Sequence, residues 1–170
     1  MLQYPDIYVF DTSSFIELKD YPNDLFIDLW ERIEDMIGLR IRAPIQVYEE
    51  IKRKDDEITK FVERHKNEIF VDPYNDKEIR EEVNKIMEKY PKLIKSERVS
   101  SNNECADPYV IAMAKVLQAR GLGGRAIVVT EDIRDSRKKI SIRSVCKAEG
   151  IECITLLELF RREGWQFTII

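Results

Sequence analysis

The chain has 170 residues, of which 44% are apolar and 35% charged, and this composition is typical of one globular domain with a sizeable core. Its apolar runs are far shorter than the roughly 20 residues that span a bilayer, and its first residues lack the pattern of a signal peptide. We therefore expect a cytoplasmic protein without membrane association. The net charge of −4 does not indicate nucleic-acid binding, although residues 134–143 form a locally basic segment.

The amino-terminal part alternates between short strands and helices. Residues 7–10 are a compact β-branched and aromatic run, which predicts a strand. Apolar residues at helical spacing then predict a helix over 25–37. Residues 39–43 alternate like a strand, and Pro44 suits the first turn of a helix over 44–51. Acidic residues open a further helix over 55–62.

The second part continues this alternation with a strand over 69–71 and amphipathic or apolar helices over 79–90 and 108–119. Residues 126–130 form the clearest strand, and their continuous apolar character suits a central parallel strand. A last strand and helix follow over residues 151–162. The order predicts a single α/β domain over residues 1–170, with a three-layer architecture and a mostly parallel sheet. In such sheets ligands bind beyond the carboxyl ends of the strands, where the strand order reverses.

The side chains present limit the chemistry. His65 is the single histidine and lies in a charged helical stretch, so a surface position explains it better than catalysis. The cysteines Cys105, Cys146 and Cys153 are odd in number and form no Cys-x-x-Cys pair, which argues against a disulfide framework and a zinc site. If the protein is an enzyme, its titrating groups are carboxylates.

Two predicted strands end in acidic residues. Asp11 directly follows the first strand, and Asp132 follows the strand at residues 126–130 after Thr130 and Glu131. Asp11 alone could simply cap the next helix. The same arrangement on a second buried strand shifts the balance toward a functional site.

Two more acids lie in helical contexts. Asp107 precedes a proline and could serve only as a helix cap, or it could contribute to a site. Glu50 borders the apolar face of its predicted helix, whereas Glu49 points nearly opposite, so Glu50 can reach an interior pocket. Clustered carboxylates raise one another's pKa unless a cation neutralises them. Oxygen ligands without histidine or cysteine suit Mg²⁺ or Mn²⁺, which activate water for attack on phosphodiesters.

Four segments together resemble the PIN-domain family over nearly the whole chain. Residues 9–13 (Val-Phe-Asp-Thr-Ser) are similar to its first motif, and residues 47–51 (Val-Tyr-Glu-Glu-Ile) to its second. Residues 106–114 are similar to the third motif, an Ala-Asp start to an Ala-rich helix. Residues 128–135 are similar to the fourth. The resemblance implies a five-stranded parallel sheet in the order 3-2-1-4-5, a Mg²⁺ or Mn²⁺ site, and cleavage of single-stranded RNA.

The resemblance also implies roles for individual residues. Asp11, Asp107 and Asp132 would hold the metal and Glu50 would be a ligand or the base, with Asp135 a fifth candidate and Glu131 a substitute for Asp132. The predicted substrate-binding residues are Thr12, Ser13, Thr130, Arg134, Arg137 and Lys138. Small members of the family are often toxins that form homodimers and bind an antitoxin protein. A second copy of the chain and an antitoxin are therefore candidate partners here. The chain departs from them by a helical insertion around 72–100 and by Pro108 after the third acid.

Two alternatives stay open. The first is a catalytically silent PIN scaffold that binds RNA or a protein partner, although a scaffold has no need of four carboxylates. The second is a phosphotransfer domain of the receiver or dehalogenase type, which also places Asp at strand ends. A dehalogenase requires Asp-x-Asp after the first strand, but Ser13 stands where the second Asp would be.

Overall fold

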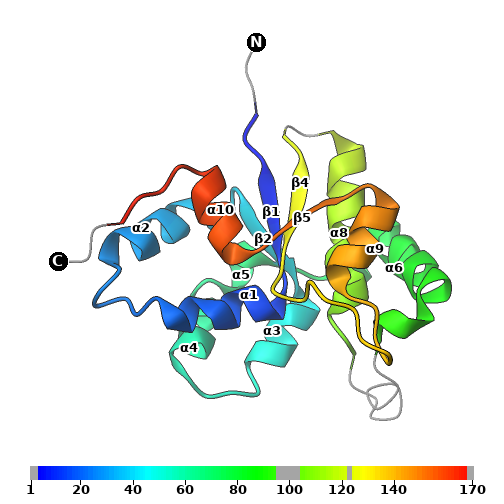
Figure 1. The fold of residues 1–170 in the computed structure, drawn as a ribbon, viewed down its shortest axis with the longest axis horizontal. Helices are drawn as coiled ribbons and strands as arrows, with labels where there is room; N and C mark the ends of the chain where they lie inside the picture. Colours follow the sequence, from blue (N-terminus) through cyan, green and yellow to red (C-terminus); the bar gives the residue numbers. More distant parts are fainter. Residues whose placement is uncertain (1–3, 95–103, 122–123, 168–170) are drawn as a thin grey trace.

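A computed structural model describes residues 4–94, 104–121 and 124–167. Its centre is a parallel five-stranded sheet in the order β3-β2-β1-β4-β5, which confirms the predicted fold class and strand order (Figure 1). The strands are β1 (Ile7–Phe10), β2 (Ile41–Pro44), β3 (Phe70–Val71), β4 (Ala126–Val129) and β5 (Glu152–Ile154).

Helices connect the strands and cover both faces of the sheet. The α-helices before β3 are α1 (Thr12–Glu17), α2 (Ile27–Met36), α3 (Ile45–Ile51), α4 (Glu57–Arg64) and α5 (Lys66–Ile69). The α-helices after β3 are α6 (Lys77–Lys89), α8 (Asp107–Arg120), α9 (Ile142–Glu149) and α10 (Leu156–Arg162). Short 3-10 turns are η1 (Leu18–Asp20), η2 (Pro73–Asn75) and η3 (Pro91–Leu93).

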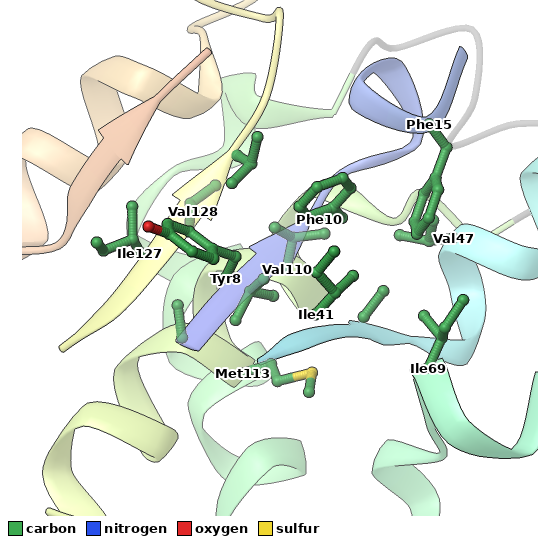
Figure 2. Packing of buried hydrophobic residues seen from close by; sticks show 14 of the residues in the cluster. Tyr8, Phe10, Phe15, Ile41, Val47, Ile69, Val110, Met113, Ile127 and Val128 are labelled. Carbon is green, nitrogen blue, oxygen red and sulfur yellow. The ribbon is translucent and has the colours of Figure 1, made fainter. Parts of the chain in front are cut away.

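The helices form two layers around the sheet. Figure 1 shows α1, α2 and α10 on one side of the strands and α6, α8 and α9 on the other. The two central strands are buried on both faces, because every residue of β4 is buried and Tyr8, Val9 and Phe10 of β1 are at most 1% exposed. Figure 2 shows side chains of β1 and β4 gathered in one apolar cluster with Val110 and Met113 of α8. This packing fixes the position of the strand ends.

The switch in strand order lies between β1 and β4. These strands pair in register from Ile7–Ala126 to Phe10–Val129, and the backbone amide of Asp11 donates to the Val129 carbonyl at 2.9 Å. The residues that follow the two strands therefore emerge beside each other at one edge of the sheet. A crevice at this position is where open parallel sheets bind ligands.

Several local predictions differ from the structure. Pro44 ends β2 instead of lying in the first turn of a helix, since its extended backbone (ψ 151°) places it outside α3. Helix α9 lies in a region where no helix was predicted, because its apolar positions fall within a strongly charged segment. The predicted insertion at 72–100 contains α6, and its last residues lie outside the described part of the chain. In the described part, no helix has the length and apolar character needed to cross a bilayer.

Candidate metal centre

A cavity of about 250 Å³ opens at the carboxyl ends of β1 and β4. It brings together the four acids predicted from the sequence, which come from widely separated parts of the chain. The residues that line it are Asp11, Thr12, Ser13, Ile16, Glu50, Cys105, Asp107, Asp132 and Lys139. The predicted convergence of Asp11, Glu50, Asp107 and Asp132 is therefore present in the fold.

Asp11 is the most buried acid of the cavity, with 4% of its surface exposed. Its Oδ2 atom accepts hydrogen bonds from the hydroxyls of Ser13 and Thr130, each at 2.8 Å. The Asp11 side chain makes no capping hydrogen bond to α1, so helix capping does not explain an aspartate at this position. Burial and the nearby Asp107 carboxylate raise the pKa of Asp11 to about 7, although the two hydroxyls act in the opposite direction.

Glu50 reaches the cavity from the last turn of α3. Its Oε2 accepts from the Thr12 hydroxyl at 2.7 Å, and its Oε1 accepts from the Ala106 backbone amide at 3.0 Å. Glu50 thus connects α3 to the first residue of α1 and to the residue that precedes α8. Glu49 does not line the cavity and forms an ion pair with Lys52 on the partly exposed side of the helix. The expectation from helical periodicity that Glu50, and not Glu49, reaches an interior pocket is confirmed.

Asp107 is the first residue of α8 and does not cap it. The residue before the helix is Ala106, which makes no side-chain cap, and the Asp107 carboxylate turns into the cavity instead. Burial raises the pKa of Asp107; Lys139 opposes this effect, and the carboxylates of Glu50 and Asp132 add to it. The simpler sequence interpretation of this residue as a helix cap is therefore wrong.

Asp132 supplies the fourth acid of the cavity. Its backbone amide donates to Thr130 Oγ1 at 3.0 Å, so the hydroxyl that donates to Asp11 also fixes the turn that carries Asp132. The Asp132 Oδ2 atom accepts from the backbone amide of Ile142, the first residue of α9, at 3.2 Å. Thr130 and the start of α9 together hold this carboxylate in place.

The two competing candidates for this position lie elsewhere. Glu131 Oε1 accepts from the Leu156 amide at 2.8 Å and so binds the start of α10. Asp135 is exposed, and its Oδ1 accepts from the Ser141 amide and the Ser144 hydroxyl, each at 2.8 Å. Neither residue lines the cavity. The structure thus does not bring Asp135, the predicted fifth metal ligand, to the other acids.

Lys139 is the charged cavity residue that sequence reasoning missed, and Ile16 and Cys105 also line the cavity without having been predicted. Its Nζ atom lies 2.8 Å from Asp107 Oδ2 and 2.5 Å from Asp132 Oδ2, with 18% of the side chain exposed. The two carboxylates raise the pKa of Lys139 above its usual value against the opposing effect of burial. One ammonium cannot neutralise four carboxyl groups, and burial still keeps the pKa of Asp107 raised although Lys139 opposes it. The only sequence signal was its place in the basic run after Asp135.

The predicted substrate-binding residues fall into two groups. The hydroxyl residues hold the acids: Thr12 donates to Glu50, while Ser13 and Thr130 donate to Asp11. The basic group is exposed on the segment between β4 and α9, outside the residues that line the cavity. This second group consists of Arg134, Arg137 and Lys138.

The acids fit a hard divalent cation by their chemistry, since all of their donor atoms are carboxylate oxygens. Their present arrangement is different from a preformed site. Within the described ranges, no group of three or more carboxylate, thiol or imidazole side chains is placed to hold a metal ion. Lys139 already lies between Asp107 and Asp132, so its ammonium occupies the place that a cation shared by these two carboxylates would take.

Comparison with protein families gives a match over almost the whole chain. Residues 8–167 match a family described as a domain of unknown function, DUF4411. The chain belongs to the DUF4411 family. A search of curated proteins gave no match. The matched region of this DUF4411 protein contains all four cavity acids and Lys139, so the site belongs to the family domain itself.

Proposed function

We propose that this DUF4411 protein is a metal-dependent ribonuclease of the PIN type that cleaves single-stranded RNA. One observation carries the proposal: Asp11, Glu50, Asp107 and Asp132 converge in one cavity at the switch point of a parallel sheet. Such a cluster is costly without a cation, and its oxygen atoms suit Mg²⁺ or Mn²⁺. The strand order is also the one that the PIN resemblance implies.

The four acids of the cavity would each have a specific role in a hydrolase. Asp11, Asp107 and Asp132 would hold the metal, and Glu50 would either complete its ligands or orient the attacking water. A bound divalent ion supplies an activated water and stabilises the charge that develops on a phosphate. The Thr12 hydroxyl donates a 2.7 Å hydrogen bond to Glu50 and so keeps the Glu50 carboxylate facing the cavity.

The substrate class depends on the resemblance and on the basic segment. Arg134, Arg137 and Lys138 are exposed on the chain that follows Asp132, where they can contact a phosphate backbone close to the acids. An antitoxin partner and a homodimer are further proposals that rest on the resemblance to small PIN toxins. The acids support phosphodiester chemistry, and the choice of RNA over DNA rests on the PIN resemblance alone.

The test compares neighbouring glutamates on the same helix. Cleavage of labelled single-stranded RNA is measured with Mn²⁺ for the wild type, Glu50→Gln and Glu49→Gln, with single-stranded DNA of the same sequence in parallel. We expect Glu50→Gln to lower the rate by about 100-fold or more, as loss of a transition-state contact does, and Glu49→Gln to leave it unchanged. Equal cleavage by all three proteins would reveal a contaminating nuclease and remove the support for the proposal.

A second candidate is the catalytically silent scaffold, and the position of Lys139 favours it. An ammonium between Asp107 and Asp132 neutralises part of the cluster without any metal. A scaffold of this kind would bind RNA or a protein partner through the same surface but would bind no Mn²⁺ at millimolar concentration. A Mn²⁺ titration therefore separates the two functions directly.

A further inference from the structure

Lys139 is presented to the cavity by a turn whose backbone is fixed on both sides. The Ser136 amide donates to the Lys139 carbonyl at 2.8 Å, and the Lys139 amide donates to the Ser136 hydroxyl at 3.1 Å. The next amide, that of Ile140, donates to the Lys92 carbonyl at 3.0 Å. The turn therefore anchors the Lys139 backbone, and the flexible four-carbon stem of a lysine allows its ammonium to move without the backbone.

The ammonium of Lys139 performs the electrostatic task of a metal ion. It contacts one oxygen of Asp107, at the start of α8, and one oxygen of Asp132, after β4. A divalent cation held by the same two oxygens would lie within a few ångströms of the ammonium. Two cations at that distance repel each other strongly in a partly buried site, so both cannot occupy this place.

We propose that the Lys139 ammonium and a divalent cation are alternative occupants of the place between Asp107 and Asp132. This inference rests on the proposed metal-dependent function and deepens it. In the metal-free protein Lys139 holds the two carboxylates together. Metal binding displaces the ammonium from both of them, so the affinity of the site for metal is set by the competition as well as by the acids.

The experiment measures Mn²⁺ affinity without using activity. Free Mn²⁺ is followed by electron paramagnetic resonance during titration of the wild type, Lys139→Met, Lys139→Arg and Lys147→Met. Lys147 is an exposed residue of α9, so its variant controls for the loss of one positive charge from the protein surface. We expect Lys139→Met to bind Mn²⁺ at least about tenfold more tightly, which corresponds to about 1.4 kcal/mol. Lys139→Arg and Lys147→Met should remain within about twofold of the wild type.

Thermal unfolding, measured in EDTA and separately with Mn²⁺ in place of EDTA, provides the second measurement. Lys139→Met should unfold at a lower temperature than the wild type, because Asp107 and Asp132 lose their counter-ion, and Mn²⁺ should raise its unfolding temperature by more than that of the wild type. If Lys139→Met does not fold, Lys139→Gln is used, since its amide can still donate a hydrogen bond to one carboxylate. The same gain in Mn²⁺ affinity is expected of it.

The outcomes separate this inference from the proposed nuclease. If the wild type binds Mn²⁺ and Lys139→Met binds it equally or more weakly, competition is refuted and the nuclease proposal stands. If only the Lys139 variants bind Mn²⁺, competition is supported and the metal-dependent function of the wild type is refuted. If neither protein binds Mn²⁺ at millimolar concentration, both proposals are overturned.

Discussion

The Asp11→Asn substitution removes the negative charge of the most buried acid of the cavity and keeps the size of its side chain. Burial and the Asp107 carboxylate raise the pKa of Asp11 from 3.8 to about 7. A carboxyl group with a raised pKa in the folded state stabilises the protein at low pH, and this contribution is lost as the pH rises from about 4 to about 7. The metal-free wild type therefore carries an unfavourable charge at pH 8 that the variant lacks.

The size of the effect follows from two opposing contributions. The difference between a pKa of 3.8 and one of about 7 corresponds to about 4 kcal/mol. The amide of asparagine accepts hydrogen bonds from Ser13 and Thr130 less strongly than a carboxylate does. This weaker bonding lowers the stability of the variant by about 1 to 2 kcal/mol. We expect the variant to be more stable than the wild type by about 2 kcal/mol at pH 8, or about 4 to 8 °C in Tm, with little difference at pH 4.

The assay is thermal unfolding in EDTA at pH 4 and pH 8, followed by circular dichroism. Asp135→Asn is the matched control, because Asp135 is exposed and hydrogen bonds from Ser141 and Ser144 hold its pKa below the usual value. Neutralising Asp135 should lower stability at pH 8, which is the opposite sign. An Asp11→Asn protein that unfolds at or below the wild-type temperature at pH 8 would refute the electrostatic reasoning.

Two further predictions concern the frame around the site. In Gly124→Ala the added Cβ would lie 2.5 Å from the Pro5 carbonyl oxygen, so we expect a loss of about 1 to 3 kcal/mol in urea unfolding, and an unchanged midpoint would contradict this. Glu163 receives hydrogen bonds from Arg40 at 2.5 and 2.9 Å and from Tyr8 at 2.5 Å, and these contacts outweigh burial and lower its pKa. Glu163→Gln should therefore cost about 1 to 3 kcal/mol at pH 7, and the difference should shrink as the pH falls below 4.5 and Glu163 becomes protonated in the wild type. A pH-independent difference would argue against this pair.

Hydrophobic periodicity was sufficient to predict the sheet and the positions of two of the acids. The continuous apolar runs of β1 and β4 identify buried parallel strands, and a residue that follows such a strand emerges at its carboxyl end. This placed Asp11 at the crevice, and helical spacing selected Glu50 over Glu49. These predictions depend on local geometry, which the chain encodes within a few residues.

The role of Asp107 could not be decided in the same way. Capping and a site function both place an aspartate before Pro108, and the choice depends on which direction its carboxylate takes. In the fold Ala106 occupies the capping position and its amide donates to Glu50, so Asp107 begins the helix and faces the cavity. Glu50, which accepts this hydrogen bond from Ala106, is more than 50 residues away in the sequence, so the local pattern cannot reveal the contact.

The sequence by itself thus determined that acidic residues lie at one edge of the sheet, because strand patterns fix where the side chains that follow each strand emerge. The tertiary structure decided which of Glu131, Asp132 and Asp135 enters the cavity, because the starts of α9 and α10 bind the alternatives. It also decided that Lys139, among several basic neighbours, turns inward. Periodicity carries no information about such residues, since the direction of an irregular segment is set by contacts with elements remote in sequence.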